Sequence, residues 1–147
     1  CLKKLIELVD HLFNSIPSGL HPKEGCVRLT TSQLDEVLVQ GVKWLEANGY
    51  ATKNDLDVCE ENGHIQNADP HKVSELAHNR GAPQVGSLGS GNHFLEIQKV
   101  QEIHDKEAAK TMGIFEGQIT VLIHCGSRGL GHQVCTDYLK ICEASHQ

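Results

Sequence analysis

The sequence predicts an α+β fold in which a β-strand core is flanked by helices. Helical patterns come first along the chain, and two strand patterns alternate with short helices in the last third. Apolar residues that recur every three or four positions indicate helices, whereas short apolar runs bounded by glycines are typical of buried strands. Two glycine-rich loops, at 86–93 and 125–131, also lie in the last third. We therefore expect the chemistry of the protein there.

The first half of the chain is predicted to be helical. Apolar residues from Leu2 to Ile16 recur at helical spacing, and 17–19 (PSG) should end that helix. A second helix is expected to begin at an N-cap, Ser32, and to close at Gly49. A short helical turn is expected at 54–61.

Helices and strands then alternate. Asp69-Pro70 is a typical helix start, so a helix is expected to run to about residue 80, with Gly81 as its C-cap. The remaining expected elements are a strand at 94–100, a helix at 105–112 ended by Gly113, a strand at 119–123 and a last helix from about His132.

Composition narrows the class of protein. The 147 residues carry a formal net charge of -6, which argues against a bulk electrostatic nucleic-acid binder but leaves room for a small basic pocket. No apolar run approaches the roughly 18 residues that a membrane span needs, and no signal peptide is visible. The six cysteines form no CxxC pair. An intracellular protein with reduced thiols is expected.

The first glycine loop combines metal-binding and hydrogen-bonding side chains. Its sequence at 89–96 is GSGNHFLE. Glycines let the backbone approach a ligand, and successive N–H groups in such a loop can bind an anion. Asn92 offers hydrogen bonds and His93 offers an imidazole nitrogen to a metal. The alternative is a tight turn whose histidine is merely hydrogen-bonded.

The second loop follows an apolar strand. His124 ends that strand, and Arg128 within the loop is a planar donor suited to a phosphate. Neither nucleotide fingerprint is met, because the glycine order is GxxGxG and no Gly-Lys-Ser/Thr follows. The alternative is a strand–turn–helix corner with Arg128 in a surface ion pair. Two loops that each pair glycines with a histidine favour a shared site.

A zinc site is a further alternative. His124, Cys125, His132 and Cys135 carry zinc-binding groups, but their spacing is not that of a standard structural site. Adjacent residues such as the first two seldom bind one ion together. A small zinc-stabilised module therefore stays a minor hypothesis.

The two loops resemble the signatures of the RtcB family of RNA ligases. Residues 89–96 (GSGNHFLE) are similar to that family's GxGNHF/Y-x-E signature, and 123–133 (IHCGSRGLGHQ) to its H-S-G-S-R-G-L-G-H-Q signature. The stretches 68–74 (ADPHKVS) and 80–86 (RGAPQVG) resemble the intervening sequence. The likeness extends from the first helix to the end of the chain, so 1–147 would be the central part of an RtcB-like catalytic domain.

The resemblance implies an activity and its cofactors. It implies a GTP- and Mn²⁺-dependent ligase, with two metal ions, that joins RNA 3′-phosphate or 2′,3′-cyclic phosphate ends to 5′-hydroxyl ends. In such transfers metals neutralise charge and orient the reacting groups. RNA and GTP would be the partners, as in tRNA splicing or RNA repair. Subunits of a tRNA-splicing complex would join them in a eukaryote, in the cytoplasm and nucleus.

The resemblance also assigns roles to residues. His93 would bind one Mn²⁺ and His124 the other. Asn92, His93, Phe94, Leu95 and Glu96 would line the guanylate pocket. Arg128 would hold an RNA phosphate or the transferring group. Cys125 replaces the family's serine and places an oxidisable thiol beside the site.

Other family residues have no counterpart in this chain. The nucleophilic histidine and a third metal histidine are expected C-terminal of residue 147. The bridging cysteine of an Asp-x-x-Cys motif is expected upstream, and Cys26 does not supply it because Lys23 stands where the aspartate belongs. We expect the chain alone not to ligate RNA. The alternative function is a degenerate, non-catalytic paralogue that binds metal and nucleotide.

Overall fold

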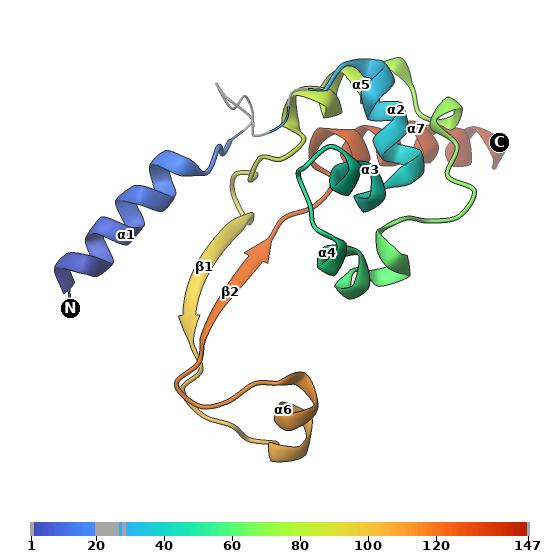
Figure 1. Ribbon diagram of the computed structural model, residues 1–147. Helices are drawn as coiled ribbons and strands as arrows, with labels where there is room; N and C mark the ends of the chain where they lie inside the picture. Colours follow the sequence, from blue (N-terminus) through green and yellow to red (C-terminus); the bar gives the residue numbers. More distant parts are fainter. Residues whose placement is uncertain (1, 20–26, 28, 147) are drawn as a thin grey trace. The chain divides into compact units, whose positions relative to one another are not determined.

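The computed structural model divides into two compact units (Figure 1). It describes residues 2–19, 27 and 29–146, and Cys26 lies outside them. Unit 1 contains the described residues up to 19 together with 88–126, and unit 2 contains the rest. Both units are therefore built from segments far apart in the sequence.

Unit 1 consists of two helices and one pair of antiparallel strands. The helix α1 covers Leu2–Ser15. Strands β1 (Phe94–Lys99) and β2 (Ile119–His124) pair in antiparallel fashion. The connection between the strands carries α6 (Lys106–Met112). All four elements lie within two residues of the predicted bounds, which confirms these predictions.

Local capping explains why α6 forms where it does. The Asp105 carboxylate accepts hydrogen bonds from the backbone N–H groups of Glu107 and Ala108, at 3.0 and 2.9 Å. These contacts satisfy donors that the first helical turn leaves without partners. Gly113 ends the helix in the left-handed conformation (φ +68°), which glycine adopts without steric cost.

The hairpin has one polar face and one apolar face. Its register pairs Leu95 with Ile123 and Ile97 with Val121, and side chains alternate between faces along a strand. These four residues therefore share the apolar face. A groove of about 380 Å³ lies between the apolar side chains of α1 and residues of this face. Its lining is Leu5, Leu8, Val9, Leu12, Phe13, Ile16, Ser18, Leu88, Leu95 and Ile97.

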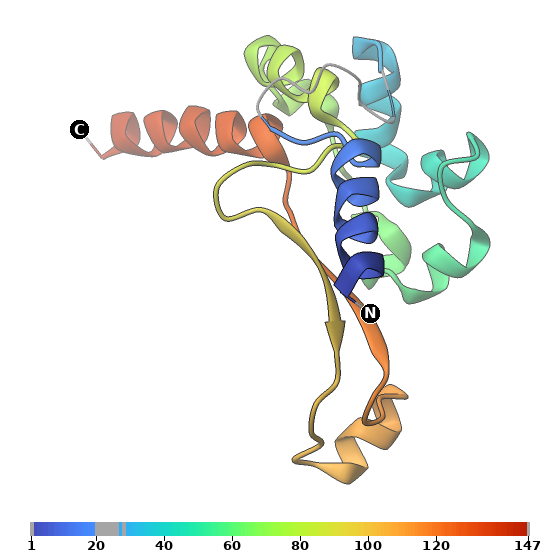
Figure 2. The same ribbon diagram turned by 90° about the vertical axis from the view of Figure 1, so that its left-hand side faces the viewer.

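Unit 2 is helical. Its elements are α2 (Thr31–Gln40), α3 (Val42–Ala47), α4 (Lys53–Val58), η1 (Glu60–Gly63), η2 (Pro70–Lys72), α5 (Glu75–Gly81), η3 (Ala82–Gln84) and α7 (Arg128–Ser145). Helix α5 packs against α7, which is the long straight helix that leads to the C-terminus in Figure 2. The predicted turn at 54–61 corresponds to α4 and the start of η1.

The second predicted helix is two helices. Thr30, not Ser32, is the N-cap, because Thr30 and Gln33 form a reciprocal capping box. The helix breaks at Gly41, whose φ is +57°. A Cβ there would collide with the carbonyl oxygen of Gly63, so a close backbone approach requires the glycine.

The helix predicted from Asp69 to about residue 80 is also interrupted. Asp69 does accept a hydrogen bond from the N–H of His71, but this turn ends after three residues. A second N-cap, Ser74, then starts α5. Gly81 is not the predicted C-cap: it is helical and buried, and a Cβ there would lie 2.8 Å from the Cβ of Leu130. Packing against α7 explains this glycine.

The last helix begins earlier than expected. It starts at Arg128 rather than near His132, and Ser127 is the residue before it. Glycine is a poor helix former, so the two glycines in this first turn made the sequence there look like a loop. No helix among the described residues is long and apolar enough to cross a membrane.

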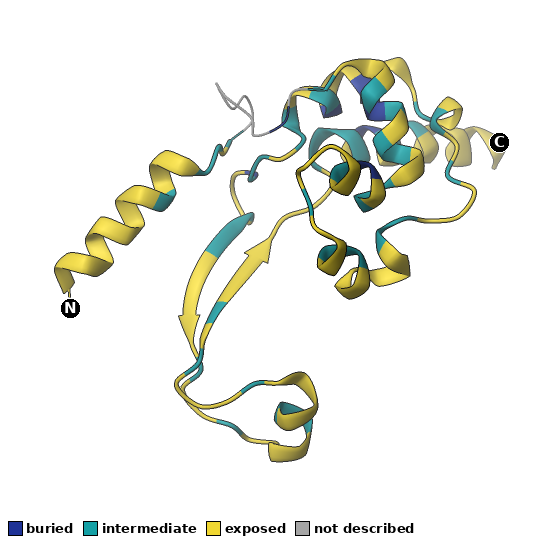
Figure 3. Cartoon of the chain, in the orientation of Figure 1, coloured by how far each residue is buried: buried dark blue, intermediate teal, exposed yellow. Residues whose placement is uncertain are grey.

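The α+β class is confirmed, but burial differs from the expected strand core. Among the described residues, the buried apolar side chains all belong to unit 2; they are Val27, Leu34, Trp44 and Ala77. The strands leave most of their side chains exposed, as Figure 3 shows. The strand patterns identified the strands correctly, and the buried core of the described residues is helical.

Candidate functional site

The hairpin brings the two predicted metal histidines to one end. His93 immediately precedes β1, and Phe94, the first residue of β1, pairs with His124, the last residue of β2. Directly opposed Cα atoms in antiparallel strands lie about 4.5–5.5 Å apart. Two histidines that are 31 positions apart in sequence therefore lie at the same end of the strand pair.

An aromatic contact fixes the plane of one imidazole. The rings of Phe94 and His124 stack with centroids 5.1 Å apart and planes inclined by 22°. Contacts of this kind contribute about 0.5–1.5 kcal/mol beyond the burial of area. The stack restrains the ring of His124, which is otherwise exposed at the end of β2.

His93 carries an unsatisfied nitrogen. Its Nδ1 is buried and makes no hydrogen bond to any part of the chain that the structure describes. A buried polar atom without a partner typically costs about 1–3 kcal/mol. A metal ion or a ligand donor at this nitrogen would remove that cost, so the position fits the predicted metal ligand.

Glu96 lies on the same face of the hairpin as Phe94 and His124, because it is two residues along β1. Gln98 Nε2 donates a hydrogen bond of 2.7 Å to Glu96 Oε2. Leu95 instead belongs to the apolar face and lines the groove beside α1. Its predicted role in the guanylate pocket stays a prediction, and its contacts are those of a packing residue.

The first glycine loop is anchored to the end of α1. Leu88 donates its N–H to the Pro17 carbonyl at 2.8 Å, and its own carbonyl accepts from Gly19 N–H at 3.0 Å. Gly91 has a φ of +72° with open space where a Cβ would lie, so its glycine is required by conformation. Asn92 is exposed next to it. This arrangement leaves the loop open to a ligand.

Two glycines of the second loop, Gly129 and Gly131, serve packing in unit 2. The N–H of Gly129 donates to Gln84 Oε1 at 2.8 Å, and a Cβ there would crowd Arg80. A Cβ on Gly131 would collide with the side chain of Ser127. These contacts hold the start of α7 against α5 and η3.

Arg128 has an unusual backbone. It is half-buried, and its φ is +53°. A residue with a Cβ in this region costs roughly 1–3 kcal/mol, and such strain is concentrated at functional sites. Cys125 is exposed, and its thiol is accessible next to His124.

A polar network in unit 2 was not foreseen from the sequence. Asp137 on α7 accepts hydrogen bonds from Ser74 at 2.6 Å and Gln133 at 2.8 Å. These two hydrogen bonds, that from Ser74 first, lower the pKa of Asp137. Arg80 donates to Gln133 at 2.7 Å, so the network ties α5 to α7. The two hydrogen bonds that join residues of different helices, Ser74–Asp137 and Arg80–Gln133, link residues more than 50 positions apart, so no local pattern predicts them.

A second polar contact ties α2 to α5. His78 is buried, with its Nε2 2.7 Å from Asp35 Oδ1 and its Nδ1 3.0 Å from the Ser74 carbonyl oxygen. Both ring nitrogens therefore have partners, which is what a buried imidazole requires. His78 is a structural histidine, as opposed to a candidate ligand.

The zinc alternative gains no support. Within the described residues, no group of three or more His, Cys, Asp or Glu side chains is placed to hold a metal ion. His124 and Cys125 belong to unit 1, whereas His132 and Cys135 lie on α7 in unit 2.

Comparison with known proteins establishes the class of the protein. A family model described as "tRNA-splicing ligase RtcB" matches residues 2–147. The chain belongs to this family, which confirms the prediction made from the two loops.

Individual relatives agree with the family model. The chain is 56% identical to the tRNA-splicing ligase RtcB of Thermococcus kodakarensis over 144 residues, which are 98% of this chain and 30% of the relative. It is 56% identical to that of Pyrococcus abyssi over 95% of this chain and 15% of the relative. It is 55% identical to RNA-splicing ligase RtcB homolog 1 of Entamoeba histolytica over 94% of this chain and 26% of the relative. The chain thus spans less than a third of each of these relatives.

Proposed function

We propose that this chain supplies part of the active site of a GTP- and Mn²⁺-dependent RNA ligase. That enzyme would join RNA 3′-phosphate or 2′,3′-cyclic phosphate ends to 5′-hydroxyl ends, in tRNA splicing or RNA repair. Family membership over residues 2–147 supports the reaction class. The observation that carries the proposal is the pairing of Phe94 with His124, which puts two histidines at one end of the hairpin.

Under this proposal His93 and His124 each bind one Mn²⁺ ion. The buried, unsatisfied Nδ1 of His93 and the imidazole of His124, held by Phe94, are suitable nitrogen donors. The metal, when bound, would neutralise phosphate charge during nucleotidyl transfer. Two histidines do not complete an octahedral shell, so the remaining ligands would be phosphate oxygens, water or other protein groups.

The other site residues would bind the nucleotide and the RNA. Asn92 in the open loop and Glu96 on the polar face would hydrogen-bond the guanylate. Arg128 would pair with an RNA phosphate, because its planar guanidinium can donate two parallel hydrogen bonds. Such local positive charge would attract an RNA phosphate although the formal net charge of this chain is -6.

The proposal is tested by Mn²⁺ titration calorimetry on the full-length protein. His93→Ala and His124→Ala are each expected to weaken Mn²⁺ binding by at least about tenfold. Removing even a residue that only hydrogen-bonds a metal ligand typically lowers metal affinity about 10–100-fold. His104→Ala is the matched control, because His104 lies in unit 1 with 84% of its side chain exposed. Unchanged Mn²⁺ affinity in both site variants would refute the metal assignment.

Activity separates the ligase from its alternative. The unmodified full-length protein is expected to become radiolabelled by [α-³²P]GTP and to join a 3′-phosphate RNA to a 5′-hydroxyl RNA. Intact Mn²⁺ and GTP binding without labelling or joining would instead favour the non-catalytic paralogue.

A further inference from the structure

The hydrogen bond between Gln98 and Glu96 lies next to the proposed guanylate pocket. On a β-strand, alternate residues point to the same face about 6.5–7 Å apart. Gln98 therefore follows Phe94 and Glu96 in one row, and its Nε2 reaches Glu96 Oε2 at 2.7 Å. Both residues are exposed, so burial does not fix either side chain.

The hydrogen bond from Gln98 restrains a side chain that burial leaves free to rotate. A glutamate in solvent samples several rotamers, and a ligand that needs one of them must immobilise the side chain on binding. The amide of Gln98 holds one carboxylate oxygen in advance. The other oxygen, Oε1, keeps its capacity to accept a hydrogen bond from a ligand.

Gln98 is too far along the strand to act at the histidines directly. Its register partner is Thr120, whereas His124 pairs with Phe94 at the other end of the same face. Any influence of Gln98 on the site must therefore pass through Glu96.

From these contacts we infer that Gln98 is a positioning residue that orients the Glu96 carboxylate for the bound nucleotide. This inference rests on the proposed function, because it takes Glu96 as a nucleotide contact. It adds to the proposed site a residue that lies outside the loop motif, on the same face of β1 as Glu96.

The test is steady-state kinetics and GTP binding of the full-length protein. Gln98→Met preserves the length of the side chain but removes the donor. It is expected to raise KM and Kd for GTP about two- to tenfold, the usual range for one hydrogen bond, with kcat unchanged. Thr120→Val is the control: it removes a polar group from the same face opposite Gln98 and should leave KM for GTP unchanged. A merely structural role for Gln98 would instead lower the active fraction and therefore the apparent kcat.

A double-mutant cycle with Glu96→Gln shows whether Gln98 acts through Glu96. If it does, Gln98→Met has no further effect on GTP affinity in the Glu96→Gln background. Weaker GTP binding in Glu96→Gln but not in Gln98→Met would overturn the inference and leave the proposed function intact. Unchanged GTP binding in Glu96→Gln would remove the nucleotide contact itself, and the role of Gln98 with it.

Discussion

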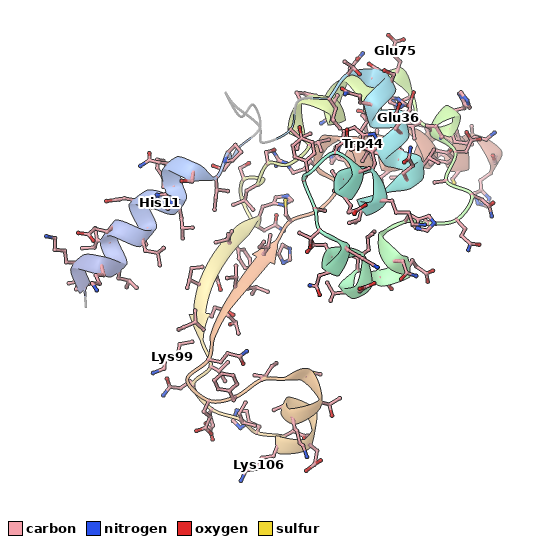
Figure 4. The ribbon with its side chains drawn as sticks, viewed as in Figure 1. His11, Glu36, Trp44, Glu75, Lys99 and Lys106 are labelled. Atoms are coloured by element: carbon pink, nitrogen blue, oxygen red, sulfur yellow. The ribbon has the colours of Figure 1, made fainter. Side chains whose placement is uncertain are left out.

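Units 1 and 2 use apolar residues in opposite ways. Unit 2 encloses the buried apolar side chains of the described residues, and Trp44 in its centre donates a 2.6 Å hydrogen bond to Glu36 (Figure 4). Unit 1 leaves apolar side chains exposed on both α1 and the hairpin, for example Phe13 at 81% and Ile123 at 61%. Yet unit 1 holds both predicted metal histidines.

The contacts that stabilise the fold therefore lie mainly in unit 2, whereas the proposed metal-binding groups lie in unit 1. The hydrogen bonds of unit 2 link side chains on three helices, α2, α5 and α7. The hairpin of unit 1 gains little from burial and places its functional groups by strand register, by the stack of Phe94 on His124 and by the hydrogen bond from Gln98 to Glu96. Substitutions should therefore change stability mainly in unit 2 and ligand binding mainly in unit 1.

The largest expected effect on stability is at the centre of unit 2. Leu34 is 1% exposed, so Leu34→Ala should lower the unfolding free energy of the chain by about 2–5 kcal/mol. Leu5→Ala on α1, where the leucine is 57% exposed, is the matched control and should cost less than about 0.5 kcal/mol. Urea unfolding followed by the fluorescence of Trp44, the only tryptophan in the chain, measures both. Equal losses would abolish the distinction between the units.

A smaller effect is expected at Arg128, where unit 2 carries a proposed functional residue. Arg128→Gly and Arg128→Ala both remove the guanidinium, but only the glycine relieves the strain at φ +53°. The glycine variant should therefore be more stable than the alanine variant by about 1 kcal/mol, while both lose affinity for RNA phosphate. Thermal unfolding and RNA binding at fixed salt concentration measure the two effects. An alanine variant as stable as the glycine variant would show that the backbone is not strained.

The smallest effect is a dependence on acid pH. Because the folded pKa of Asp137 is below its ordinary value of 3.8, the unfolded chain binds more protons at low pH. The contribution of this group is therefore complete above pH 3.8 and is lost as the pH falls through the folded pKa. Asp137→Asn should lower the urea midpoint at pH 7 and bring the variant closer to the unsubstituted chain at pH 3. An equal difference at both pH values would contradict the cause assigned to the shift.

Local patterns were sufficient to predict α1, both strands and α6. Apolar runs identified both strands, and Asp105 and Gly113 marked the ends of α6 correctly. Family likeness to two loop motifs predicted the family that the comparisons then showed.

Contacts between residues distant in sequence caused the differences between the predicted and the observed helices. The break at Gly41 depends on the approach of Gly63, and the helical conformation of Gly81 depends on Leu130. Each of the two compact units also joins segments that are separated by tens of residues. A short stretch of sequence contains no information on contacts between distant residues. The residues that share a face of the strand pair follow only after the pairing of the strands is known. The role of Gln98 also required the structure, because its contact with Glu96 follows from side-chain geometry.

The most direct test of the metal assignment is pulsed electron paramagnetic resonance of Mn²⁺ bound to the full-length protein with ¹⁵N-labelled histidine. The account predicts ¹⁵N couplings from directly bound imidazoles. His93→Ala and His124→Ala should each remove part of these couplings, and His104→Ala should leave them unchanged. Couplings that are absent, or that survive unchanged in both site variants, would contradict the claim that the end of this hairpin binds metal.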